Sequence, residues 1–538
     1  MADDGTTRSE SAARGAGDDP GGGSADPHGT GTDGAEAPES EAREHETAVL
    51  HAVTRGAGIS IGGILLQRGL LFATNLLLTN SLGVAAYGLY ALGRRIVGML
   101  QGFAHLGSNP TLVRLLPKHA DAPDRQRRVL GTAYLTTAVT SATLAAGLFA
   151  FAPTIESYTA PGDQFVPVLR AFAVLLPVLT FVWQIGNVFR SLERLEYQVV
   201  IVRVLRPAAQ LLAVGAAFAF GLSVLGVIGS VVVALAGVLA VAVGLSRSKL
   251  SIRPRPPKFR GEVREFYDFA LPNSLSTFGA LLRSRVDVLL IGALLAAEGA
   301  GIYNIALFLT GLVSLPLMSI NQLFPPVASR LYSDGDVETL RATYSTATRW
   351  ILTAGLFIAV YEIVFRVQLL GLFGPAYRRG ELVLVAFAVG QVVNCAVGSA
   401  GWLLLMSDHQ YVAAANNWVL GIVNLGLSYA LILEYGLIGA ALGTAGSLTL
   451  VNVMRVSELW YLEGIQPYDR AFAKPLAAAV VAAAAGALLR PAFGGVSLLV
   501  VGAVGTLGAF LATLVALGPE PEDRDLQRAV AEYVAAWL

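Results

Sequence analysis

The stretch LSVLGVIGSVVVALAGVLAVAVG, at residues 222–244, decides the fold class of this chain. It carries no charge and is long enough to span a membrane, because a helix needs about 20 apolar residues to cross about 30 Å of hydrocarbon. In hydrocarbon every backbone polar group must be satisfied within the protein, which leaves helices and closed barrels. Because the stretch is continuously apolar and does not alternate, it predicts a transmembrane helix.

Comparable stretches recur along the chain, and the composition agrees with them. Hydrophobic residues make up 54% and charged residues 14% of the 538 residues, and the mean hydropathy is +0.60. Soluble proteins carry about 25% charged residues, so the composition argues against a water-soluble enzyme. We predict an all-α polytopic membrane protein with about 14 transmembrane helices, near residues 57–80, 88–107, 129–152, 167–189, 199–220, 222–244, 269–294, 301–324, 349–372, 382–406, 411–433, 436–457, 474–493 and 495–517.

The charges are distributed unevenly, although 38 basic and 38 acidic residues give a net charge of zero. Residues 1–47 hold twelve acidic and three basic residues and no apolar stretch, which predicts a disordered acidic tail. Lysine and arginine concentrate in cytoplasmic loops of membrane proteins. The short loops on the side of the N-terminus carry 20 of them and the opposite loops carry 3. We therefore expect a multi-pass protein of the plasma membrane with both termini cytoplasmic.

The predicted helices fall into two similar halves. Residues 50–245 form an N-terminal six-helix bundle, and a basic linker at 246–266 leads to a C-terminal six-helix bundle at 267–458. Gly88-Leu-Tyr resembles Gly301-Ile-Tyr, and Pro110-Thr-Leu-Val-Arg-Leu resembles Pro326-Val-Ala-Ser-Arg-Leu, at offsets of 213 and 216 residues. Since six helices return the chain to the same side, the halves would be parallel repeats around a central cavity.

The remaining segments are smaller. Two extra transmembrane helices are predicted at 471–517, and their alanines and glycines suit close helix packing. The tail at 518–538 has apolar residues at helical spacing, which is consistent with an interfacial helix or a frayed end. The linker at 246–266 is interpreted as an anchor to anionic lipid headgroups, with specific lipid or nucleic-acid binding as the alternative.

Arginines lie where a lipid-facing helix would not tolerate them. An arginine at the centre of the bilayer costs about 2.5–3.5 kcal/mol on the insertion scale, so it needs a partner or water. Asp287 lies one helical turn after Arg283 and could neutralise it, and backbone carbonyls could satisfy the others. The guanidinium group suits bidentate phosphate binding, which favours an anion-binding cavity. The predicted substrate-binding residues are Arg68, Arg94, Arg95, Arg283 and Arg285.

Other polar residues in the spans are less decisive. Asn75 lies on the same helix face as Arg68, and Asn304 and Gln391 could line the same cavity or form interhelical hydrogen bonds. Asp287 is the only carboxylate identified in the middle of a span. Arginines nearer the helix ends are interpreted as reaching back to the membrane surface: Arg170, Arg203, Arg206 and Arg366.

Several functional classes lack their sequence signals. The chain has no Walker A sequence, its six histidines form no metal-binding pattern, and Cys395 is its single cysteine. We therefore expect a protein that is not an enzyme and that binds no cofactor, no metal and no nucleic acid. The loops predicted outside the membrane are too short to hold a catalytic domain.

Two motifs resemble a known family. Leu82-Gly-Val-Ala-Ala-Tyr-Gly-Leu-Tyr-Ala, followed by a span and the segment 107–114, is similar to the start of polysaccharide-repeat-unit flippases, the Wzx-like branch of the multidrug/oligosaccharidyl-lipid/polysaccharide exporter superfamily. The segment 300–306 resembles the same signature in the second half. The likeness covers residues 50–517. It implies a V-shaped pair of bundles that work by alternating access.

The resemblance also implies a substrate. Members of the family flip a polyprenyl- or dolichyl-linked oligosaccharide, held by its phosphate or pyrophosphate, from the cytoplasmic to the outer leaflet for polysaccharide or glycoprotein glycan assembly. In the similar lipid II flippases, arginines on the first, second and a mid-chain helix line the cavity, which matches the five arginines named above. Membrane lipids and the glycosyltransferases or polymerase of the pathway are the expected partners of a monomer.

Three alternatives remain open at this stage. A multidrug/cation antiporter of the same superfamily would use buried carboxylates, and only Asp287 was identified. A non-transporting scaffold of a glycan assembly complex would leave the central arginines without a role. A membrane glycosyltransferase would require an acidic cluster that the sequence lacks.

Overall fold

The computed structural model describes residues 37–159, 164–258 and 260–523, with side chains left undescribed at 37–61, 260 and 275–289. The chain divides into two units, Met1–Arg55 and Gly56–Leu538. Of the predicted disordered tail, residues 37–47 form the start of helix α1 (Ala37–Ala104). The rest of that tail lies outside the described residues.

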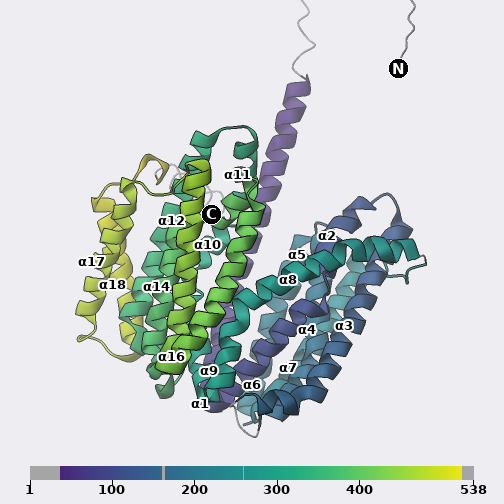
Figure 1. The fold of residues 1–538 in the computed structure, drawn as a ribbon, viewed down its shortest axis with the longest axis horizontal. Helices are drawn as coiled ribbons and strands as arrows, with labels where there is room; N and C mark the ends of the chain where they lie inside the picture. The colour runs from purple at the N-terminus through teal and green to yellow at the C-terminus, as the bar shows by residue number, and fades with distance from the viewer. Residues whose placement is uncertain (1–36, 160–163, 259, 524–538) are drawn as a thin grey trace, which may run out of the picture. The chain divides into compact units, whose positions relative to one another are not determined.

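The first half of the second unit contains α1 and seven further elements. They are α2 (Ser108–Lys118), α3 (Pro123–Ser157), α4 (Phe165–Ser191), α5 (Leu195–Gln198), the π-helix η1 (Val199–Leu205), α6 (Arg206–Ala219) and α7 (Val224–Lys249). Helices α3, α4, α6 and α7 pack side by side (Figure 1).

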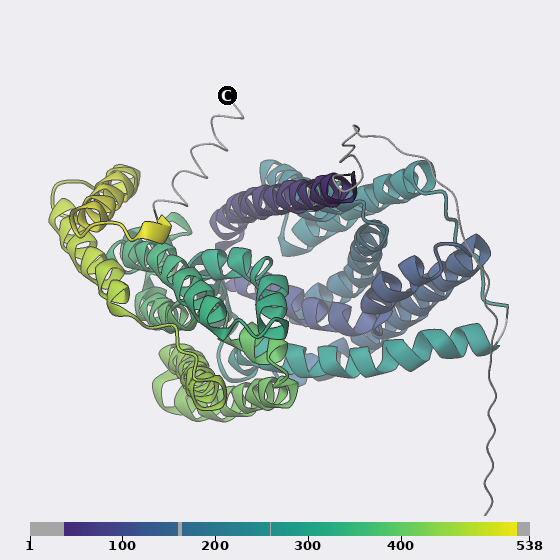
Figure 2. The same cartoon turned by 90° about the horizontal axis from the view of Figure 1, so that it is seen from above.

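The second half begins with α8 (Arg260–Leu294). It continues with α9 (Ala297–Thr310), α10 (Leu315–Ile320), α11 (Phe324–Ser333), α12 (Val337–Val364), α13 (Arg366–Leu372), η2 (Pro375–Gly380), α14 (Glu381–Val397), α15 (Ala400–Met406) and α16 (Gln410–Glu463). The two added helices, preceded by η3 (Arg470–Phe472), are α17 (Ala473–Leu489) and α18 (Gly495–Ala516). Helix α8 packs against α16 and reaches α2 and α3, so it connects both groups (Figure 2).

Among the described residues, ten helices are both long enough and apolar enough to cross a membrane. Two of the ten are double. Gly83 (φ 74°) and Gly436 (φ 58°) interrupt the helical backbone within Gly62–Lys118 and Gln410–Glu463. Glycine adopts these left-handed angles without strain. The all-α polytopic membrane fold is confirmed, while the number of fourteen spans is not confirmed by this count.

The two sequence repeats occupy corresponding places. Pro110 and Arg114 lie in the short helix α2, and Pro326 and Arg330 lie in the short helix α11. Helix α2 follows the second segment of α1, and α11 follows α9 and α10. This correspondence supports the repeat inferred from the sequence, although the proposed bundle boundaries stay a prediction.

Acidic residues at the end of the linker pair with basic residues of α2 and α3. Lys118 and Arg125 donate hydrogen bonds to Glu265 at 2.8 and 2.6 Å, and Arg128 lies 2.7 Å from Glu262. The hydrogen bond from Lys118, together with that from Arg125, lowers the pKa of Glu265 to about 2. The two glutamates at the end of the linker therefore fasten α8 to α2 and α3.

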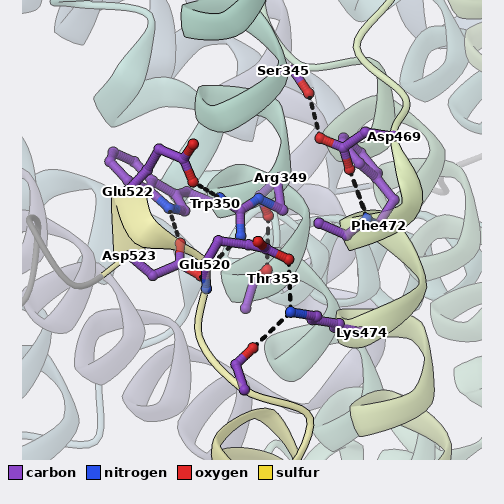
Figure 3. Close-up of polar contacts among 12 residues, drawn as sticks. Ser345, Arg349, Trp350, Thr353, Asp469, Phe472, Lys474, Glu520, Glu522 and Asp523 are labelled. Carbon is purple, nitrogen blue, oxygen red and sulfur yellow. Dashed lines mark hydrogen bonds and ion pairs between the residues drawn. The ribbon is translucent and has the colours of Figure 1, made fainter.

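The segment after α18 is held to α12 and α17 by ionic contacts (Figure 3). Arg349 lies 2.8 Å from Asp523 and 3.5 Å from Glu522, and Trp350 donates a hydrogen bond to Asp523 at 2.8 Å. Lys474 donates to Glu520 at 2.6 Å. We call these contacts the C-terminal clasp. The interfacial helix predicted beyond it lies outside the described residues.

Candidate functional site

A cavity of about 620 Å³ lies within the second unit, lined by α1, α4, α6 and α9. Among the residues that the structure describes, no aspartate or glutamate lines it. Four arginines do so: Arg68, Arg94, Arg95 and Arg206. Three of these four were predicted from the sequence. The cavity therefore has a strongly positive lining in the interior of a membrane protein, where charges interact strongly.

The arginines approach the cavity from different helices. Arg68 comes from the first segment of α1, and its guanidinium lies 3.8 Å from the sulfur of Met318 in α10 of the second half. Arg94 and Arg95 are half-buried in the segment of α1 after Gly83. The described ion pairs include neither Arg68 nor Arg94. Both charges are thus available to an anionic ligand.

Arg206 is the lining residue that the sequence interpretation missed. The helix was expected to begin near residue 199, which placed Arg206 close to an end. The membrane span in fact covers Leu195–Ala219, and Arg206 lies near its centre, directly after the π-helical turn η1. Its guanidinium carbon is 5.8 Å from the centre of the Trp183 ring, which also lines the cavity. The interpretation of Arg206 as reaching for the membrane surface was wrong.

The other arginines placed near helix ends lie away from the cavity. Arg170 is exposed and stacks over Phe149, and Arg366 pairs with Glu381 at 3.2 Å. Arg203 packs beside Gly63 of α1.

The predicted residues of the seventh span remain untested. Arg283, Arg285 and Asp287 belong to α8, and their side chains lie outside the described residues. Their assignment to the cavity, and the ion pair between Arg283 and Asp287, stay predictions.

The predicted amides divide into two groups. Asn75 and Asn304 line the cavity. Gln391 does not line it. It accepts a hydrogen bond at 3.2 Å from Asn394, which in turn accepts one from Asn452 at 3.1 Å. This chain of amides joins α14 to α16, which is the interhelical hydrogen bonding considered as the alternative.

The two halves touch each other beside the cavity. A Cβ on Gly88 would lie 1.8 Å from the carbonyl oxygen of Ala297, and a Cβ on Gly301 would lie 2.8 Å from that of Val84. The repeated Gly-x-Tyr motifs thus meet each other, because only glycine permits such a close approach of backbones. We call this meeting point the outer contact, since the charge bias predicts that it faces outside.

Tyr87 joins three helical segments at the outer contact. Its hydroxyl donates a hydrogen bond to Asn75 Oδ1 at 2.8 Å and accepts one from Asn304 Nδ2 at 2.8 Å. The side chain is fully buried and packs edge-on against Tyr377 of the second half. The link runs from the first segment of α1 through the second to α9.

Replacing Tyr87 with phenylalanine is expected to weaken the outer contact. A buried hydrogen bond contributes about 1 kcal/mol, and its loss leaves two amides without this partner. We expect a cysteine placed at Leu307, which lines the cavity, to react faster with a membrane-impermeant thiol reagent added outside. Tyr90→Phe is the matched control, because the Tyr90 hydroxyl bonds Gln210 within the first half at 3.1 Å. Equal reactivity in the two variants would contradict the role of Tyr87.

A family profile and a sequence relative each match part of this chain. The profile of the family described as polysaccharide biosynthesis protein matches residues 53–331, just over half of the chain. A probable low-salt glycan biosynthesis flippase, Agl15 of Haloferax volcanii, is 26% identical over 229 residues, which are 42% of this chain and 48% of that protein. The match therefore spans about half the length of this relative.

Solved structures share the fold at low sequence identity. The lipid II flippase MurJ in an inward closed conformation aligns with a TM-score of 0.65 and 12% identity, over 88% of this chain and 99% of that one. A multidrug resistance transporter of the MATE family and MOP superfamily, in an inward-facing conformation, aligns with a TM-score of 0.64 and 14% identity, over 74% of this chain and 96% of that one. The profile match covers more than half of a chain with this membrane fold and arginine-lined cavity, and it leads to one conclusion: the chain belongs to the family described as polysaccharide biosynthesis protein.

Proposed function

We propose that this protein flips a lipid-linked oligosaccharide across the plasma membrane. Its glycan would be carried on a polyprenyl or dolichyl phosphate or pyrophosphate, and both termini would be cytoplasmic. The protein would act as a monomeric transporter without enzymatic activity and would supply glycosyltransferases or a polymerase of its pathway. The relative from Haloferax volcanii, named as a glycan biosynthesis flippase, supports the class of substrate.

The observation that carries the proposal is the arginine-lined cavity without a described acidic residue. A phosphate is a dianion or monoanion whose oxygens match the guanidinium fork. In a site of low dielectric, each charge-assisted hydrogen bond is worth about 1.5–3 kcal/mol. All four lining arginines come from the first half, and Arg68 also contacts Met318 of the second. A bound phosphate would therefore be held by the first half, beside the Asn304 amide that the second half contributes to the lining.

The same observation argues against the main alternative. A multidrug/cation antiporter would need carboxylates where its cationic substrate binds, since a cation beside four arginines is repelled. Among the described residues, the lining offers none. A non-transporting scaffold would have no use for a positive cavity, which is unfavourable in a membrane unless a ligand or water compensates it.

The test is flipping in proteoliposomes. The probe is a polyprenyl pyrophosphate-linked disaccharide with a fluorophore on the sugar, and an impermeant quencher reports the head group that remains outside. We expect Arg68→Ala and Arg94→Ala each to slow flipping by about tenfold or more, because 1.4 kcal/mol corresponds to a factor of ten.

Arg170→Ala is the matched control, since Arg170 is an exposed arginine outside the cavity. Unchanged rates in both cavity variants would refute the phosphate-binding cavity. Transport of a cationic dye in place of the probe would favour the antiporter.

A further inference from the structure

A carboxyl group is buried in the second half, away from the arginine-lined cavity. Glu362 belongs to α12 and is 2% exposed. Neither of its carboxyl oxygens has a hydrogen-bond partner among the residues that the structure describes. It lies inside the span predicted at 349–372, so the statement that Asp287 is the only carboxylate in the middle of a span was wrong. A search of each predicted span for acidic residues would have found it.

The basic groups around Glu362 are engaged elsewhere. The elements packed against α12 are α9, α10, α11, α13, α14, α17 and α18. Arg366 of α13 pairs with Glu381, and Lys474 of α17 pairs with Glu520. Arg330 lies in α11, which comes just before the start of α12, whereas Glu362 lies near the end of α12. On α12 itself, Arg349 pairs with Asp523 and Arg341 is exposed.

The remaining titratable groups on these elements supply no positive charge. They are Glu298 and Tyr303 of α9, Tyr332 of α11, Glu381 and Cys395 of α14, and Glu338, Tyr344 and Tyr361 of α12, whereas α10 and α18 carry none. Tyr344 and Tyr361 donate their hydroxyls to the carbonyl oxygens of Val397 and Leu499, at 2.7 and 2.9 Å. Neither hydroxyl is therefore donated to Glu362.

These surroundings fix the protonation state of Glu362. An ionised carboxylate that is buried without a cation or a hydrogen bond is strongly unfavourable, so the group neutralises by binding a proton. A membrane-embedded ionisable residue of this kind is retained for function far more often than for stability. In this conformation, Glu362 therefore holds a proton.

The nearest basic residue in the chain lies one helical turn after Glu362. Arg366 follows it by four residues, and this spacing brings two side chains together on a continuous helix. Here the helix is interrupted at Phe365 (φ −102°, ψ 21°) between α12 and α13, and Arg366 bonds the carbonyl oxygen of Ile363 at 3.1 Å as well as Glu381. If α12 and α13 joined into one helix, Arg366 would reach Glu362 and favour its ionised form.

We propose that Glu362 is a proton-binding site that couples flipping to a proton gradient. Glu362 is protonated when Arg366 is held by Glu381, and it releases its proton when Arg366 turns to it in the other conformation. No bond other than that to the proton is formed or broken. The inference rests on the proposed function, because it requires a cycle between two conformations.

The protonation of Glu362 can be measured without any substrate. Infrared difference spectra of the purified protein, recorded between pH 7 and pH 10, should contain the carbonyl band of a protonated carboxyl in an apolar environment. We expect this band to disappear in Glu362→Gln and to shift in Glu362→Asp. Glutamine is uncharged and nearly isosteric with the protonated side chain, so the fold should tolerate it. An unchanged band in both variants would overturn the assignment.

Coupling is measured as the ratio of flipping rates with and without a pH difference across the liposome membrane. One pH unit changes the occupancy of a proton site by up to about tenfold, so we expect the wild-type ratio to differ from one by several-fold. Glu362→Gln should flip the probe at equal pH and show a ratio near one. Glu338→Gln, an exposed glutamate on the same helix, should retain the wild-type ratio.

The two proposals fail in different ways. A wild-type protein that does not flip the probe at equal pH contradicts the proposed function, and the infrared band still tests the proton site. A Glu362→Gln variant that flips the probe and keeps the wild-type ratio overturns the coupling and leaves the proposed function intact.

Discussion

Gly88→Val is expected to stop flipping by holding the outer contact open. The new side chain would begin 1.8 Å from the carbonyl oxygen of Ala297, a backbone atom that cannot turn away. The second segment of α1 and the start of α9 must therefore separate before valine fits. Overpacking of this kind costs about 1–3 kcal/mol, which changes the ratio of closed to open protein by about 5- to 150-fold.

The expected state can be recognised independently of flipping. With the outer contact open, the cysteine at Leu307 should react with an impermeant reagent from outside, in a background where the buried Cys395 is replaced by alanine. Gly69→Val is the matched control, since Gly69 lies on the same helix and a Cβ there meets nothing within 4 Å. If Gly88→Val blocked flipping while the cysteine stayed unreactive, the substitution would have damaged the fold, and the outer contact would not be a gate.

Arg349→Met is expected to produce the largest loss of stability. The Arg349 side chain is 7% exposed and lies 2.8 Å from Asp523, which is 27% exposed. Removing one partner of a buried ion pair costs about 3–5 kcal/mol, and the partial exposure of Asp523 places the expected loss at about 2–3 kcal/mol. The residue was counted in the sequence as a charge that sets orientation, whereas in the fold it anchors the C-terminal clasp (Figure 3).

Thermal unfolding of the detergent-solubilised protein measures this effect. The midpoint should fall in Arg349→Met and recover largely in the double variant Arg349→Met, Asp523→Leu, because replacing both charges by apolar groups is often neutral. Arg341→Met on the exposed side of α12 should leave the midpoint unchanged. A single variant as stable as the double one would show that the clasp contributes nothing.

The candidate site was only partly predictable, and Arg206 shows why. Arg68 was recognisable because it lies far from both ends of an apolar run, where insertion energetics alone identify it. To place Arg206 in the cavity, one would have to know that its span begins at Leu195, four residues before the expected start. One would also have to know that η1 is a π-helix, with about one more residue per turn than an α-helix. Boundaries and π-helical turns of this kind leave no clear signal in hydropathy.

Tyr87 and Glu362 were missed for different reasons. Tyr87 was read as part of a motif, but its hydrogen bonds to Asn75 and Asn304 join residues 12 and 217 positions away in the chain. Glu362 was visible in the sequence, whereas its lack of a partner was not. Partners depend on which helices pack together and on how each is rotated, and the period of one helix specifies neither.

The sequence by itself determined that the chain is a bundle of membrane-spanning helices. Apolar length and backbone hydrogen bonding in hydrocarbon leave no other solution for these stretches. The tertiary structure alone decided that the two segments of α1 and helix α6 bring four arginines to one cavity, and that the repeated glycines of the two halves touch. Insertion energetics act on one helix at a time, but a cavity and its gate exist only in the packing between helices.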